Sequence, residues 1–132
     1  MLSIEELEKM NIFSGFNNEF GFELVEYSKG HCIGKIVVRE NQLNPWGTVH
    51  GGIIYSLADT LGGVTAISEA EHQVVTLTGA TNYIGSADGT EIIAEGKNVH
   101  VGRTTVVTDV EVRTETGKLV SKTTFTYFII KK

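Results

Sequence analysis

The longest apolar pattern in the chain lies between residues 51 and 69 and has the period of a helix. At 100° per residue, one arc of this helix is apolar and is expected to face a sheet; it holds Ile53, Ile54, Leu57, Ala58, Leu61 and Val64. The opposite side carries small and polar residues, and Asp59 is its only charge before Glu69. A helix without charge all round is typically buried, and each interior glycine costs about 1 kcal/mol relative to alanine. Gly62 and Gly63 therefore indicate the close approach of another backbone, which we expect to belong to a second copy of the chain.

Strand patterns on both sides of this helix predict an antiparallel sheet. Strands are expected at 20–27, 31–39, 73–84, 91–101, 104–113 and 118–130. A bend or bulge is expected at Gly102 and Arg103, and the capping-box pair Ser3 and Glu6 predicts a short helix over residues 4–11. The order of elements predicts a single α+β domain over residues 1–132, with an N-terminal helix in 1–15 and a core in 20–131. In that core, about six antiparallel strands wrap around one long central helix.

Composition and charge limit the possible partners. The chain has 132 residues, a formal net charge of −5 and no basic run, which argues against nucleic acid as a partner. Its single cysteine, Cys32, excludes an internal disulfide and is expected to be a buried structural thiol in a reducing compartment. His31, His72 and His100 lack metal-ligand spacing, so no metal is expected. Without a leader or 18 consecutive apolar residues, the chain is expected to be cytoplasmic and not to enter a membrane.

The candidate chemistry lies at the start and in the middle of the central helix. Gly51 and Gly52 leave room for a ligand beside the first N–H groups of the helix, which have no internal partners and can polarise a carbonyl. A half-buried Asp59 would have the perturbed pKa that is typical of catalytic carboxylates. The alternative is a surface aspartate on a helix weakened by glycine. Gly51 and Asp59 are eight residues apart, about 12 Å along the axis, so an antiparallel partner helix is needed to bring them to one reacting carbon.

The pattern Asn44-x-x-Gly47-x-x-His50-Gly51-Gly52-x(6)-Asp59 resembles the hotdog-fold acyl-CoA thioesterases, most closely the phenylacetate-degradation type. The resemblance covers about residues 20–130. It implies a hotdog fold and hydrolysis of a thioester, normally on coenzyme A, with no cofactor beyond the coenzyme A of the substrate. It also implies a homodimer at least, expected to assemble further into a homotetramer.

The resemblance implies roles for five residues at the reacting group. The Gly51 amide would polarise the carbonyl, and Asp59 of the other subunit would attack it or activate a water. Asn44 would hold the water or the carbonyl, and His50 would orient the loop or bond near the carbonyl. Thr76 falls where this family often places a hydroxyl near the acid. The alternatives are a simple turn at Asn44, an N-terminal cap at His50 and a strand former at Thr76.

Coenzyme A carries phosphates, and the family usually binds them at the hairpin after the fourth strand. Here that hairpin contains Gly102, Arg103 and Thr104, with Lys97 upstream, and Gly52 would approach the ligand through its amide. A solvated Arg103 beside a bulge is the alternative. Two other functions stay open at this point: a hydratase or dehydratase acting on acyl thioesters, and a non-catalytic acyl-CoA-binding protein. The chain lacks the loop patterns typical of hotdog hydratases and dehydratases. It also retains Asp59, the acid that a non-catalytic relative would lose.

Overall fold

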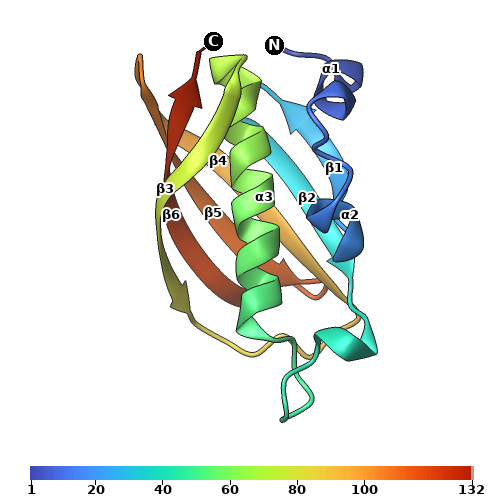
Figure 1. The fold of residues 1–132 in the computed structure, drawn as a ribbon. Coiled ribbons are helices and arrows are strands. Elements are labelled where there is room, and N and C mark those ends of the chain that lie inside the picture. Colours follow the sequence, from blue (N-terminus) through green and yellow to red (C-terminus); the bar gives the residue numbers. More distant parts are fainter. Residues whose placement is uncertain (132) are drawn as a thin grey trace.

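The computed structural model describes residues 1–131, which form one antiparallel sheet around one long helix (Figure 1). The helices are α1 (Ile4–Lys9), α2 (Phe16–Glu19) and α3 (Gly51–Ala70), with a 3-10 turn, η1, at Glu40–Gln42. The strands are β1 (Glu23–Ser28), β2 (His31–Val37), β3 (Gln73–Tyr83), β4 (Glu91–Val101), β5 (Thr105–Thr114) and β6 (Leu119–Ile130). Their order across the sheet is β1-β2-β4-β5-β6-β3. The predicted α+β class and the order of its main elements are confirmed.

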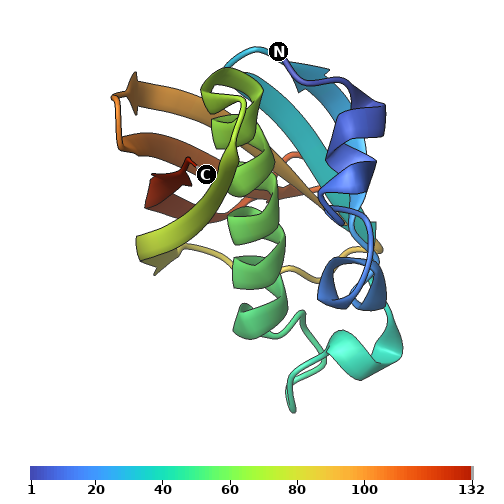
Figure 2. The same ribbon diagram turned by 45° about the horizontal axis from the view of Figure 1, so that its top comes forward.

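The sheet curves around α3, which runs along its concave face (Figure 2). Leu57, Ala58 and Leu61 have no exposed surface, as predicted for the apolar arc. The expectation that Gly62 admits the backbone of a second copy was wrong, because Gly62 is buried within the same chain. A Cβ added at Gly62 would lie 2.3 Å from the hydroxyl oxygen of Tyr127 in β6. Gly62 therefore makes room for a side chain of its own sheet and not for a second backbone.

Alternation along the strands produces the two faces of the sheet. In β5 every second residue, from Val106 to Thr114, is buried against α3, and the residues between them are half-buried on the outer face. The buried face of β6 includes Phe125 and Tyr127, whose rings are stacked at 5.5 Å. Period-two patterning places one set of side chains on each face, so the faces of these strands were readable from the sequence.

The segment before β1 departs from the prediction. A strand was expected from Phe20, but residues 16–19 form α2 and the strand begins at Glu23. The side-chain Nδ2 of Asn17 donates to the Ile12 carbonyl at 2.9 Å, which stabilises the compact turn instead of an extended chain. The aromatic residues that suggested a strand, Phe20 and Phe22, are buried beneath this turn.

The structure also tests the predicted capping box of the first helix and the predicted bend or bulge at the β4–β5 hairpin. The capping box of α1 is confirmed by reciprocal bonds of 3.1 Å between Ser3 and Glu6, although α1 ends at Lys9 because Asn11 has a left-handed φ of 64°. Of the bend or bulge expected at Gly102 and Arg103, the bend is present at Arg103, and the bulge lies at Val99, where the β4–β5 register shifts. The N–H of Gly102 donates to the Thr105 carbonyl at 2.8 Å and closes the hairpin turn. Within residues 1–131, no helix is long and apolar enough to cross a membrane.

Candidate active site

The loop before α3 is tied together by the side chain of Asn44. Its Oδ1 accepts bonds from the backbone N–H groups of Trp46 and Thr48, at 3.0 and 3.1 Å, and its Nδ2 donates to the Thr48 hydroxyl at 2.9 Å. These contacts form a side-chain-stabilised turn. The turn alternative therefore describes Asn44 in the free protein, and its contact with water or a carbonyl stays a prediction.

His50 is the N-cap of α3. Its Nδ1 accepts the N–H of Gly52 at 2.8 Å, so His50 caps the helix, and its role in orienting the loop or bonding near the carbonyl stays a prediction. This bond occupies the Gly52 amide. The N–H of Gly51 has no acceptor within residues 1–131, while its carbonyl accepts the Tyr83 hydroxyl at 2.8 Å. The Gly51 N–H is thus free to polarise a ligand. The Tyr83 hydroxyl on β3 fixes the next peptide group through the Gly51 carbonyl.

Asp59 lies two turns further along α3, on the side facing β3 and β6. The Thr76 hydroxyl donates to its Oδ1 at 2.7 Å, and the Tyr127 hydroxyl lies 3.3 Å from the same oxygen and 2.8 Å from the Asp59 carbonyl. Burial raises the pKa of the Asp59 carboxyl above its usual range, although the two hydroxyls act in the opposite direction. The structure therefore brings Asp59 and Thr76 together, as the sequence predicted, and adds Tyr127, which it did not.

A pocket of about 140 Å³ lies beside this carboxylate. Its polar lining includes Asp59, Thr76 and Tyr127 together with Asn17 and Thr60, and Ile12 and Ile67 are among its apolar walls. A larger depression of about 460 Å³ lies between α1 and β1, but it contains none of these three residues. We assign the site to the smaller pocket, because there an acid of the central helix, whose pKa burial raises, meets two hydroxyl groups from neighbouring strands.

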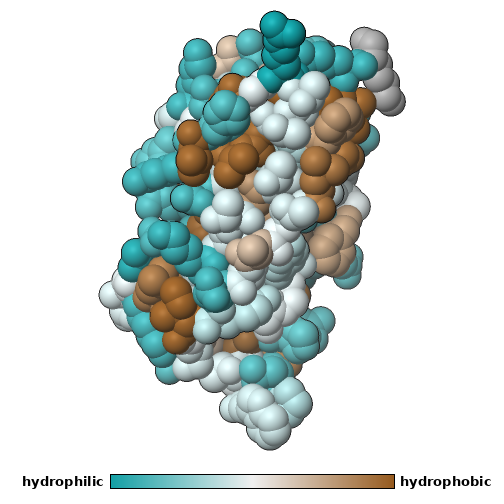
Figure 3. Space-filling model, turned by 90° about the vertical axis from the view of Figure 1, so that its left-hand side faces the viewer, coloured by the Kyte–Doolittle hydropathy of each residue, from teal (hydrophilic) through white to brown (hydrophobic). Residues whose placement is uncertain are grey.

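Thr76 reaches Asp59 because β3 is irregular at this point. The β3–β6 register shifts between Thr76 and Thr78, so Leu77 is left unpaired as a bulge. Beyond the bulge, β3 continues along the edge of the sheet, paired only with β6 among the described strands. Val75 and Leu77 are about half exposed there. Figure 3 views the side of the molecule that carries β3 and β6 and shows apolar patches among weakly polar surface. A second chain is one partner that such an edge accepts.

The residues predicted to hold coenzyme A lie apart from this pocket, and all of them except the half-buried Gly102 are exposed. Gly102, Arg103 and Thr104 form the β4–β5 turn. Lys97 lies on the outer face of the sheet, in a depression that also contains Glu95 and Asp109. Neither Lys97 nor Arg103 lines the pocket beside Asp59, so their contact with phosphate stays a prediction.

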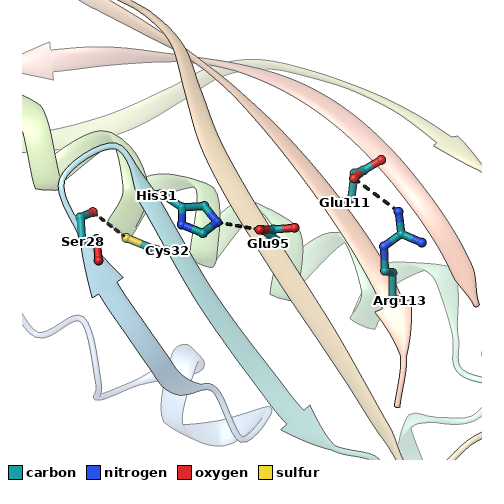
Figure 4. Close-up of polar contacts among 6 residues, drawn as sticks. All are labelled: Ser28, His31, Cys32, Glu95, Glu111 and Arg113. Carbon is teal, nitrogen blue, oxygen red and sulfur yellow. Dashed lines mark hydrogen bonds and ion pairs between the residues drawn. The ribbon is translucent and has the colours of Figure 1, made fainter. Parts of the chain in front are cut away.

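Other reactive side chains are engaged elsewhere (Figure 4). His31 Nε2 lies 2.5 Å from a carboxylate oxygen of Glu95 on the neighbouring strand, a pairing that the sequence analysis missed. The buried Cys32 thiol lies 3.5 Å from the Ser28 carbonyl, and burial raises its pKa. A thiol that stays protonated is a poor nucleophile. In the described part of the chain, no three potential ligands lie close enough to hold a metal ion.

Tyr127 is the residue of the site that sequence reasoning missed. The alternation of β6 places it on the buried face, where an aromatic side chain is expected to belong to the core. The missing information was the register, since Thr76 and Tyr127 are direct cross-strand partners although they lie 51 positions apart in the sequence. Only that pairing makes the tyrosine hydroxyl a neighbour of the acid.

A long helix enclosed by a six-stranded antiparallel sheet, with an acid on the helix and a glycine-rich helix start, defines a hotdog-fold protein. Residues 46–121 match the family model of the thioesterase superfamily, and the chain belongs to that family. A 1,4-dihydroxy-2-naphthoyl-CoA hydrolase from Listeria monocytogenes is 28% identical over 120 residues, which cover 89% of this chain and 98% of that protein.

Solved structures agree with this assignment. A hypothetical thioesterase from Streptococcus pneumoniae, determined with coenzyme A, is 33% identical and has a TM-score of 0.78, with 85% of this chain and 90% of that chain covered. The PaaI protein from the phenylacetic acid degradation operon of E. coli shares the fold, with a TM-score of 0.88 at 20% identity over 96% of this chain and 92% of that chain. The predicted resemblance is confirmed, and the protein is a thioester hydrolase.

Proposed function

We propose that this thioester hydrolase cleaves acyl-CoA, with the Asp59 carboxylate attacking the thioester carbonyl or activating the water that attacks it. The observation that carries the proposal is the placement of Asp59, half-buried beside a pocket with one carboxylate oxygen held by the Thr76 hydroxyl. Water is consumed and the products are a carboxylic acid and the free thiol of coenzyme A. Both roles of Asp59 require its ionised form.

The N–H of Gly51 is the proposed donor to the thioester oxygen. It is the free amide at the start of a twenty-residue helix, where the dipole favours negative charge, and one such donor is worth about 10² to 10³ in kcat. Gly51 and Asp59 are eight residues apart in one regular helix, or about 12 Å along its axis. A single thioester carbon does not span that distance, so the Gly51 and the Asp59 of one site are proposed to come from two different copies.

The proposed assembly is a homodimer in which β3 and α3 of each copy face the other, and two such dimers form a tetramer. The half-exposed Val75 and Leu77 on the sheet edge support this arrangement. The proposed phosphate ligands of coenzyme A are Arg103 and Lys97, with Gly102 and Thr104 shaping the turn, and the proposed location is the cytoplasm. Coenzyme A bound in the Streptococcus pneumoniae structure supports this ligand class.

The test of Asp59 is thiol release from a panel of acyl-CoAs. We expect Asp59→Asn to lower kcat by at least about 100-fold. The matched control is Asp109→Asn, because Asp109 also accepts a threonine hydroxyl at 2.7 Å, from Thr124, but lies on the outer face of the sheet. A folded Asp59→Asn protein with full activity would overturn the proposed mechanism.

The shared site is tested by mixing two inactive chains, Asp59→Ala and Gly51→Pro. Proline is tolerated at the first helical position and removes the N–H, and the extended ψ of 137° at His50 is compatible with a following proline. Mixed dimers contain one site with both intact residues, so activity should return to about a quarter of the wild-type value in an equal mixture. Mixed dimers that form without regaining activity would contradict the two-chain site.

A further inference from the structure

One oxygen of the Asp59 carboxylate is held and the other is free. The hydroxyls of Thr76 and Tyr127 both approach Oδ1, at 2.7 and 3.3 Å. Within residues 1–131, Oδ2 accepts no hydrogen bond. The Tyr127 hydroxyl also donates to the Asp59 backbone carbonyl at 2.8 Å, so one phenol proton is shared between the main chain and the side chain of the same residue.

The position of the Tyr127 hydroxyl is built by three elements. Its ring is 1% exposed and stacks on Phe125 in β6. On the helix side, Gly62 leaves the space that the hydroxyl fills, since a Cβ there would be 2.3 Å from the oxygen. On the edge strand, Thr76 is the direct cross-strand partner of Tyr127, and the bulge at Leu77 follows it immediately. A buried phenol that its neighbours restrict to one conformation is a rigid hydrogen-bond donor.

We propose that Tyr127 is a positioning residue that, together with Thr76, fixes Oδ1 of Asp59 and leaves Oδ2 as the oxygen that acts on water or on the thioester. This proposal deepens the proposed function and rests on it. Tyr127 acts on the substrate only through Asp59, by fixing the χ angles of the carboxylate and by tethering its backbone. A reactive group held to one geometry reaches its near-attack conformation without further ordering.

The chemistry of the pair agrees with this role. Burial raises the pKa of Tyr127 well above 10, and the nearby Asp59 charge acts in the same direction. The phenol therefore remains a donor over the working range of the enzyme. Hydrogen bonds to the ionised form of a carboxyl lower its pKa, so Tyr127 and Thr76 partly offset the rise that burial causes at Asp59. Losing the hydroxyl should therefore raise the pKa of Asp59.

The experiment compares kcat, KM and the pH profile of Tyr127→Phe with those of the wild-type enzyme. We expect kcat to fall about tenfold, which corresponds to one net hydrogen bond to a charged group, with most of the loss in kcat and not in KM. The acid limb of the profile should move up by about half a pH unit. The matched control is Tyr27→Phe, whose hydroxyl is buried on β1 without any partner and whose loss should change neither quantity.

Gly62→Ala provides a second, independent variant, because its new methyl group displaces the Tyr127 hydroxyl without removing it. It should show the same upward movement of the acid limb, which keeps the test decisive if Tyr127→Phe does not fold. An unchanged acid limb in either folded variant would overturn the proposal, even if kcat falls, because a purely structural defect lowers activity without moving that limb. Full activity of Asp59→Asn would instead overturn the proposed function itself.

Discussion

Replacing Gly62 by alanine is the most direct test of how α3 fits its sheet. A Cβ at this position would lie 2.3 Å from the Tyr127 hydroxyl oxygen, 3.1 Å from a Val110 methyl and 3.3 Å from the Phe125 ring. All three neighbours are buried, with exposures of 1% or less. The methyl group therefore has no open space to enter, and the hydroxyl has to leave its hydrogen bond with the Asp59 carbonyl.

The magnitude follows from three opposing effects. Alanine gains about 1 kcal/mol of helix propensity over glycine. Overpacking a buried site costs about 1–3 kcal/mol, and loss of the hydroxyl bond costs about 0.5–1.5 kcal/mol. The net effect is a destabilisation of about 0.5–3.5 kcal/mol. For a domain of this size each kcal/mol lowers Tm by roughly 3–5 °C, so Gly62→Ala should lower Tm by about 2–18 °C.

The assay is thermal and denaturant unfolding at one fixed protein concentration, since association makes Tm concentration-dependent. The decisive comparison is a double-mutant cycle with Tyr127→Phe. In that background the atom that would lie 2.3 Å from the new methyl is absent, so adding Gly62→Ala should cost at least about 1 kcal/mol less than it does in the wild type. Equal costs in both backgrounds, or a stabilised single variant, would refute the assignment of Gly62 to the tyrosine hydroxyl.

Three further predictions concern charge and capping. Because burial raises the pKa of Asp59, activity should be lost on acidification with a midpoint pH above about 3.9, the usual pKa of an aspartate. The same raised pKa means that ionised Asp59 destabilises the folded state once the pH rises through that pKa. Asp59→Asn should therefore raise Tm at pH 7, and a lowered Tm would contradict this. Ser3→Ala should remove the cap of α1 and cost about 1 kcal/mol, measured by urea unfolding with Ser14→Ala, outside any capping box, as the reference. Hydrogen bonds from the backbone N–H groups of Thr90 and Glu91 lower the pKa of Glu115 from 4.5 to about 2. The ionised carboxylate therefore stabilises the fold above pH 4.5, and this stabilisation is lost as the pH falls to about 2. Glu115→Gln should be less stable than wild type at pH 6 and equally stable near pH 2.

Much of the fold was readable because its signals are local. The capping box at Ser3 and Glu6, the period of α3 and the alternation of β5 each depend on contacts within a few residues or on one face of one element. The segment around Phe20 was misread because its signal is not local. Its aromatic side chains are equally suited to a strand and to a buried turn, and the Asn17 bond to the Ile12 carbonyl decides between them.

The candidate site likewise has parts that local sequence signals predicted and parts that depend on contacts between distant strands. The helix start and the acid were found from one helix, since a free amide and an isolated charge are visible in sequence. The partners of Asp59 depend on the β3–β6 register and on the bulge at Leu77. A shift of one residue would turn Thr76 to the other face of the sheet, and no pattern in either strand sets that register by itself. Gly62 was misassigned for the same reason, because its neighbour Tyr127 comes from the last strand.

Two aspartate–threonine pairs in this protein show what separates a reactive carboxylate from an ordinary one. Thr76 donates to Asp59 and Thr124 donates to Asp109, both at 2.7 Å, so the pairing itself does not distinguish them. Asp109 projects from the outer face of β5, where solvent supplies any further partner. Asp59 is half-buried between a helix and its sheet, and a pocket adjoins it. Burial raises the pKa of this carboxyl, and the hydroxyls of the buried Tyr127 and the exposed Thr76 partly offset that rise. Both hydroxyls approach Oδ1, so within residues 1–131 the oxygen Oδ2 is left without a hydrogen bond beside the pocket.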